Sequence, residues 1–168
     1  MNRRNFNLFL ASSTLVAMTG CGRWMPDRWR SYFQVTSIGV HKASRKMYVY
    51  HKGLVLKEYD IDLGFTPVGG KRIEGDGKTP EGTYVIDRKN PDSMFHLSLG
   101  ISYPNTQDIA QAKALGQSPG GDIFIHGQPT SGRVTVNDWT WGCIAVSNKD
   151  IEELYRTVRI GTPITIRP

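Results

Sequence analysis

Short segments rich in Val, Ile, Tyr and Thr alternate along this chain with glycine and proline. The 168 residues include 18 glycines and 9 prolines. Glycine and proline favour turns, whereas β-branched and aromatic residues favour strands. With 39% hydrophobic residues the chain is long enough for one domain with a real core. The pattern therefore predicts a single, mainly β domain.

The expected elements follow from these boundaries. Strands are predicted at residues 35–42, 46–53, 54–64 and 95–100, and a turn followed by a strand at 77–89. Buried strands are expected at 121–127 and 142–146, and a last strand at 162–168. A short helix is expected at 106–116, with Ile109, Ala112 and Leu115 on one face. Ser147 and Asp150 form the S-x-x-D pattern of a capping box, so a second helix should begin after Ser147 and end before Gly161.

The first twenty residues differ from the rest of the chain. A basic start with Arg3 and Arg4 precedes an apolar run that is too short to cross a bilayer, which is typical of a secretory signal. The sequence MTGC then resembles a bacterial lipobox, which implies a lipid on Cys21. We therefore expect a signal peptide at 1–20, a lipid-attachment cysteine and tether at 21–34, and the folded domain at 35–168. Cleavage without lipidation and twin-arginine export remain alternatives.

The charge is mildly basic. The whole chain carries a formal +6. Loss of residues 1–20 leaves 19 basic and 15 acidic residues, a net +4. This balance suits anionic polymers and lipid surfaces as neighbours, or an ordinary surface without a charged partner. Neither zinc-finger spacing nor a basic helix is present, so we expect no nucleic-acid partner.

Cys143 could have either a structural or a catalytic role. If Cys21 carries a lipid, Cys143 has no partner for a disulfide within the chain. A free cysteine can be a small buried hydrophobe. Gly142 before it, however, permits close approach to the backbone and leaves amide N–H groups where an oxyanion could lie. Cys143 is therefore a candidate nucleophile.

A nucleophilic cysteine needs a base, because an ordinary thiol is only a few per cent ionised at neutral pH. The chain has four histidines. His41 and His51 lie among lysines in the predicted opening hairpin, and His96 begins a short strand. His126 ends the apolar segment DIFIHG and is followed by a glycine, so it emerges at a strand end. His126 is the predicted base.

These motifs resemble the L,D-transpeptidase (YkuD-type) catalytic domain. The sequences IHG at 125–127 and WGC at 141–143 resemble its signature, and GDGKTPEGTYVI, LGISYPN and PGGDIFIHG follow in the family's order. The resemblance implies a β-sandwich-like fold with one or two short helices. It implies that Cys143 is the nucleophile, His126 the general base and acid, and the Gly142 backbone part of an oxyanion hole. It further implies substrate contacts at Gly127, Trp141 and Tyr103, and no metal or cofactor.

Two positions depart from the family's signature. Trp141 replaces a histidine immediately before Gly-Cys, and Ala145 replaces an arginine two residues after the cysteine. The nucleophile and its base are retained. Because an imidazole and a guanidinium that could meet a substrate carboxylate are both missing, we expect a branch of the family with altered substrate recognition.

The expected function is acyl transfer on peptidoglycan stem peptides through a Cys143 thioester, in a periplasmic protein anchored to a membrane of the bacterial envelope. Three alternatives remain open. They are a hydrolase on the same fold, a non-enzymatic wall-binding lipoprotein, and a zinc hydrolase that uses His126 and Cys143. The acceptor, the target membrane and the oligomeric state do not follow from the sequence.

Overall fold

The computed structural model describes residues 34–132 and 134–168. The expected signal peptide, Cys21 and most of the tether lie outside these residues. The described elements are, in chain order, β1 (Ser37–His41), β2 (Lys46–His51), β3 (Leu54–Asp60), β4 (Gly82–Ser93), β5 (His96–Ile101), α2 (Thr106–Ala114), β6 (Phe124–His126), β7 (Ile144–Ala145), α3 (Asn148–Thr157) and β8 (Pro163–Arg167).

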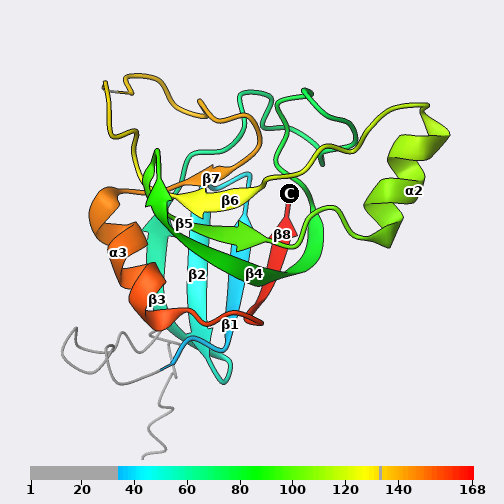
Figure 1. The fold of residues 1–168 in the computed structure, drawn as a ribbon. Helices are drawn as coiled ribbons and strands as arrows, with labels where there is room; N and C mark the ends of the chain where they lie inside the picture. The colour runs from blue at the N-terminus through cyan, green and yellow to red at the C-terminus, as the bar shows by residue number, and fades with distance from the viewer. Residues whose placement is uncertain (1–33, 133) are drawn as a thin grey trace, which may run out of the picture.

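The strands form one continuous sheet with the order β3-β2-β1-β8-β4-β5-β6-β7. β1 pairs with β8 and β6 with β7 in parallel, whereas the other neighbours are antiparallel. The long strand β4 joins two halves, because its residues 82–85 pair with β8 and those from Ile86 onward pair with β5. The two halves cross at a large angle in Figure 1, so the sheet folds over on itself. The expected β-sandwich-like fold is confirmed.

The core lies between the two halves of the sheet. Its members are alternate, inward-facing residues along the strands. Examples are Ile38 and Val40 of β1, Met47 and Val49 of β2, and Leu99 and Ile101 of β5. α3 adds Ile151 and Leu154, which are fully buried. Ser147 caps this helix by accepting a hydrogen bond from the Asp150 N–H at 3.1 Å. The helix that the capping pattern predicts is therefore present, although it ends at Thr157.

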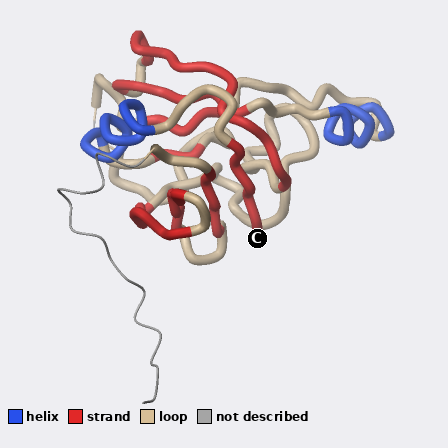
Figure 2. Tube along the Cα trace, turned by 90° about the horizontal axis from the view of Figure 1, so that it is seen from below, coloured by secondary structure: helices blue, strands red, loops and turns tan. Residues whose placement is uncertain are grey.

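The other helix packs differently from the expectation. Of its predicted apolar face only Ala112 is buried, while Ile109 and Leu115 are 47% and 53% exposed. Figures 1 and 2 show α2 projecting from the end of the molecule opposite α3. Helical spacing therefore located the helix but not its buried face, because the sheet supplies no surface beside it. Within the described residues, no helix is long and apolar enough to cross a membrane.

Candidate active site

Cys143 lies at the edge of the sheet, in the turn that leads into β7. Its side chain is partly buried, and its Sγ lies 3.4 Å from the Phe124 N–H of β6 and 3.5 Å from the Asp122 carbonyl. Burial raises the pKa of the Cys143 thiol above its ordinary value, while the hydrogen bond from the Phe124 N–H acts in the opposite direction. A buried thiol of this kind is mostly protonated at neutral pH and needs a base.

His126 ends β6, the strand parallel to β7. The register pairs His126 with Ala145, two residues after Cys143, so the turn that carries the thiol lies beside β6. The His126 Nδ1 lies 2.7 Å from the Gly127 carbonyl oxygen. Because a carbonyl only accepts, Nδ1 carries the proton and Nε2 is the nitrogen that can take one. Burial lowers the pKa of His126, so the imidazole is neutral at neutral pH.

Within the described part of the chain, the structure shows no hydrogen bond between the thiol of Cys143 and the imidazole of His126. Catalytic hydrogen bonds often tighten only once a substrate is bound, so this geometry remains compatible with proton transfer between the two.

Two aromatic side chains enclose the imidazole. The ring of Phe95 lies 4.5 Å from that of His126 at an interplanar angle of 30°, and the indole of Trp139 lies 5.5 Å away at 65°. We call Phe95, His126 and Trp139 the aromatic cluster. Only 3% of His126 is exposed. No sequence motif pointed to Phe95, which lies 31 positions before the histidine that it contacts.

Two threonine hydroxyls hold the backbone of the cysteine. Thr140 donates to the Cys143 carbonyl at 2.8 Å, and Thr79 lies 3.5 Å from the same oxygen. Thr140 also accepts the Gly142 N–H at 3.2 Å. That amide is therefore not the free oxyanion donor that the sequence predicted. In the described residues, no hydrogen bond is made by the Cys143 N–H, which leaves this amide as the candidate donor.

Gly142 serves the site through its backbone. Its φ is +120°, a conformation that side chains rarely adopt, and a Cβ built on it would lie 2.6 Å from the Lys78 carbonyl oxygen. Gly64 is equally confined, because its Cβ would lie 2.1 Å from the Gly77 carbonyl. Close packing of these glycine segments fixes the turn that carries the thiol.

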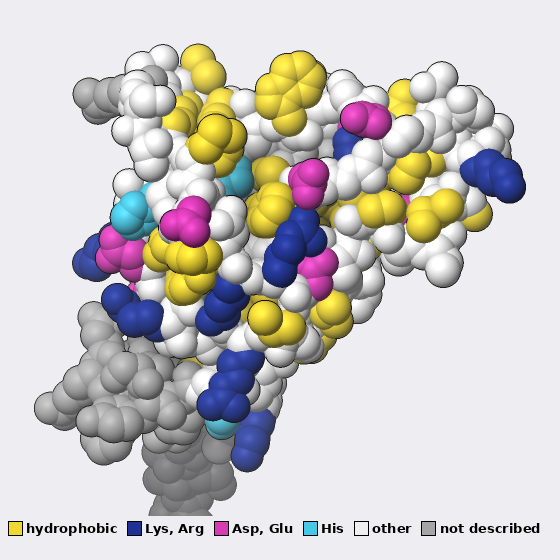
Figure 3. Space-filling view, in the orientation of Figure 1, with side chains coloured by type: hydrophobic (Ala, Val, Ile, Leu, Met, Phe, Trp, Pro, Cys, Tyr) yellow, Lys and Arg dark blue, Asp and Glu magenta, His cyan; other side chains and the backbone are white. Residues whose placement is uncertain are grey.

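The three predicted substrate-contact residues have different surroundings. Trp141 is 72% exposed and packs edge to face on Phe65 at 4.9 Å. Figure 3 shows hydrophobic side chains exposed along this upper rim, above β6 and β7. Gly127 is buried, and its carbonyl holds His126. Tyr103 is 5% exposed and donates to the Pro119 carbonyl, so it is a core residue, which corrects the expected substrate contact.

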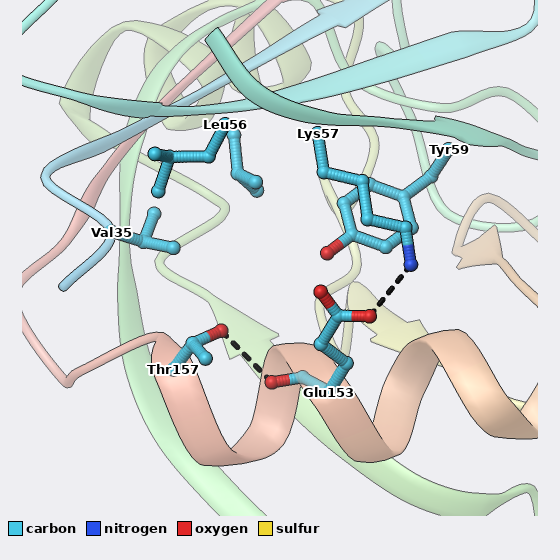
Figure 4. Close-up of a pocket in the computed structure, with 7 residues that line it drawn as sticks. Val35, Leu56, Lys57, Tyr59, Glu153 and Thr157 are labelled. Atoms are coloured by element: carbon cyan, nitrogen blue, oxygen red, sulfur yellow. Dashed lines mark hydrogen bonds and ion pairs between the residues drawn. The ribbon is translucent and has the colours of Figure 1, made fainter. Parts of the chain in front are cut away.

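Besides burial, the charged groups Asp122 and Lys71 act on the Cys143 thiol, Asp122 raising its pKa and Lys71 lowering it. His96 pairs with Glu152 at 2.8 Å. No group of three metal-ligating side chains occurs among the described residues. A small hollow between β3 and α3 is lined by Val35, Val49, Leu56, Lys57, Tyr59, Glu153 and Thr157. Figure 4 shows Glu153 reaching Lys57 across it, and it contains neither the thiol nor the imidazole.

Comparison with known proteins gives a consistent result. The pattern of the YkuD L,D-transpeptidase catalytic domain matches residues 36–166. YafK, a candidate L,D-transpeptidase of Escherichia coli strain K12, is 30% identical over 127 residues, which cover 72% of this chain and 46% of YafK. The match thus spans less than half the length of this curated relative.

Solved structures show the same fold. The helical cell shape determining protein Pgp2 of Campylobacter jejuni is 30% identical with a TM-score of 0.63, over 80% of this chain and 48% of Pgp2. Bd1075 of Bdellovibrio bacteriovorus is 30% identical with a TM-score of 0.57, over 81% and 49%. A C442S mutant of the Enterococcus faecium L,D-transpeptidase is 18% identical with a TM-score of 0.55, over 80% and 50%, which shows the fold alone.

Proposed function

The chain belongs to the YkuD family of L,D-transpeptidase catalytic domains, and from this we propose that it transfers acyl groups of peptidoglycan stem peptides through a thioester on Cys143. The observation that carries the proposal is the placement of Cys143 and His126 on neighbouring parallel segments, with the His126 Nδ1 held by the Gly127 carbonyl. This leaves Nε2 as the base, and the family supplies the substrate class.

The first half of the reaction forms the thioester. Nε2 of His126 takes the thiol proton while Sγ of Cys143 attacks a peptide carbonyl carbon. The carbonyl oxygen becomes an oxyanion, which the Cys143 N–H stabilises. As the C–N bond breaks, the protonated imidazole gives its proton to the departing amine. The products are an acyl thioester and a free amine.

The second half regenerates the enzyme. An acceptor amine attacks the thioester carbonyl and gives its proton to His126, and the C–S bond breaks. The leaving thiolate takes the proton from the imidazolium, which restores Cys143 and His126. Water in place of the amine gives hydrolysis by the same steps. No metal or organic cofactor takes part in this scheme.

Hydrolysis is the second candidate outcome. Trp141 and Ala145 stand where the family usually has a histidine and an arginine, so contacts that would select an acceptor are missing. Incubation of the purified protein with defined muropeptides, analysed by mass spectrometry, separates crosslinked products from trimmed ones. A non-enzymatic wall-binding role is excluded if an acyl probe labels Cys143.

The nucleophile itself is tested by Cys143→Ser. The hydroxyl has nearly the shape of the thiol but a far higher pKa, so His126 ionises it less readily. We expect turnover to fall about 100-fold or more, with little change in the thermal unfolding midpoint. An acyl adduct on the parent protein, detected by intact mass and absent from the variant, supports the thioester. Near-parental turnover by the variant excludes Cys143 as the nucleophile.

The cellular role that we propose is remodelling of the wall in the bacterial envelope, with an anchor on Cys21. Support comes from the lipobox-like MTGC sequence and from the 30% identity to Pgp2, which is described as determining helical cell shape.

A further inference from the structure

The three rings of the aromatic cluster pack closely against one another. The ring centroids of Phe95 and Trp139 lie 5.8 Å apart. The centroid of His126 lies 4.5 Å from that of Phe95 and 5.5 Å from that of Trp139. Each ring therefore lies within contact distance of the other two. Such spacings are typical of attractive tilted and edge-to-face ring pairs. The imidazole is therefore packed against two half-buried aromatic rings.

Trp139 occupies this place at a cost. Its Nε1–H is buried and finds no hydrogen-bond partner among residues 34–132 and 134–168. An unpaired buried donor is unfavourable, and a phenylalanine would avoid it. The indole of Trp139 therefore contributes through the packing of its ring against His126 and Phe95, and not through its N–H.

The residue before Trp139 fixes the approach of the indole to His126. Asp138 accepts from Arg45 through Nε at 3.0 Å and through a terminal nitrogen at 2.6 Å. The same carboxylate accepts the Leu63 N–H at 3.0 Å. A two-pronged Arg–Asp contact of this kind is geometrically specific. Trp139 therefore follows a rigid point of the chain, although it lies in a segment without regular secondary structure.

We propose that Phe95 and Trp139 are positioning residues that keep the His126 imidazole neutral and in one orientation, so that its Nε2 is ready to take the Cys143 proton. The proposal rests on the proposed function, because it concerns the base of that reaction. The Gly127 carbonyl selects which nitrogen carries the proton. The aromatic cluster excludes water from the ring and limits its rotation.

Charged groups on the surrounding elements do not account for the neutral state. Cys143 precedes β7, β5 carries His96, and Asp138 lies beside Trp139. The titratable residues of α3 are Lys149, Asp150, Glu152, Glu153, Tyr155 and Arg156. Asp150 and Glu153 pair with Lys57. His96 and Glu152 pair with each other, and Asp138 pairs with Arg45. Burial is the main cause of the lowered His126 pKa, and the contact with the Gly127 carbonyl opposes it. Burial of this ring is what Phe95 and Trp139 supply.

The test compares Phe95→Leu and Trp139→Leu with Trp139→Phe in the full-length protein. Opening the cluster admits water, so the His126 pKa rises toward its ordinary value and the base becomes neutral only at higher pH. We expect the acid limb of kcat/KM against pH to move upward by about half a unit or more in both leucine variants. In Trp139→Phe, which keeps an aromatic ring, the limb should stay at its parental position.

Two further measurements keep failure of this inference distinct from failure of the proposed function. Titration of the His126 ring by NMR reports its pKa without any turnover, so it remains informative if the protein proves inactive. Tyr155→Leu is the control, because the ring that it removes from α3 contacts Lys89 rather than His126. This variant should lower stability without moving the acid limb of kcat/KM against pH. An unmoved His126 titration in folded Trp139→Leu and Phe95→Leu, or a leucine-like shift in Trp139→Phe, overturns the proposal.

Discussion

Trp141 is the residue whose surroundings bear most directly on the pKa of the Cys143 thiol. An interior position, where the indole only fills space, is excluded by its 72% exposure. Trp141 lies two residues before Cys143 in the sequence, and its indole packs edge to face on the ring of Phe65. The indole adds an apolar surface at the rim of the site without adding charge. Activation of Cys143 is therefore expected to depend on His126 alone.

Replacement of Trp141 by histidine tests this dependence. Burial raises the pKa of Cys143, so alkylation of the parental thiol should accelerate only above the pH at which an ordinary thiol ionises. An imidazolium near the sulfur favours the thiolate, so Trp141→His should shift the midpoint of alkylation rate against pH to lower values. Trp141→Phe is the matched control and should keep the parental midpoint. An unchanged midpoint in folded Trp141→His would show that the residue has no electrostatic influence on the thiol.

The sequence motifs pointed to Cys143 and His126, whose catalytic roles stay predictions, but not to the residues that support them. The turn that carries Cys143 lies beside β6, which ends at His126. Phe95, Thr79 and Trp139 were missed because their roles come from long-range packing, which no local pattern records. The oxyanion role of Gly142 was misjudged for a related reason. The hydroxyl that occupies its N–H belongs to Thr140, and side-chain hydrogen bonds of this kind are not visible in a sequence.

At the scale of elements, strong local signals gave correct predictions and weak ones did not. Most strands and both helices lie where residue type and turn spacing placed them. β7 is only two residues long, because its flanking segment packs closely against the turn at Gly64 and Lys78 instead of extending the ladder. The buried face of α2 was wrong, since helical spacing alone does not reveal whether a partner surface exists.

The loop between β3 and β4 supports the turn of the thiol, and the buried amino group of Lys42 binds two of its carbonyl groups. Lys42 is 2% exposed, and its Nζ donates to the carbonyls of Gly69 and Thr79 and to the carboxylate of Glu81. Lys42→Met removes the charge but keeps much of the chain volume. Because Glu81 and two carbonyls then lose their donor, we expect the free energy of unfolding to fall by about 3 kcal/mol.

Chemical denaturation measures the effect of Lys42→Met. Its control is Lys46→Met, because Lys46 bonds to Glu58 and Asp60 in a more exposed position on the sheet. The control should change the unfolding midpoint little. Thr79, whose carbonyl Lys42 holds, also contacts the Cys143 carbonyl, so Lys42→Met should slow the thiol's acylation as well. Equal stability of the two variants would show that the buried amino group does not fix the loop.

At the scale of the whole molecule, the site and the start of the described chain lie at different ends. Figure 1 shows the chain entering at the foot of the sheet beside β1, whereas β6 and β7 lie near its upper edge. An anchor attached before Gln34 would therefore hold the domain with its site turned away from the membrane. The 13 residues from Cys21 to Phe33 span at most roughly 45 Å when extended. A lipid on Cys21 would then keep the start of the domain within about that distance of the bilayer.

The anchor is tested by Cys21→Ala in the full-length protein. A lipid on Cys21 adds buried hydrocarbon that holds a protein at a bilayer, so its loss should release the protein or leave the precursor uncleaved. We expect the parent to fractionate with membranes and to require detergent for extraction. Thiol reactivity of Cys143 should be the same in the parent and in any released variant, because the domain that carries Cys143 begins beyond the tether. A parent that is fully soluble, with a mature N-terminus other than Cys21, would exclude the anchor while leaving the chemistry of Cys143 and His126 untouched.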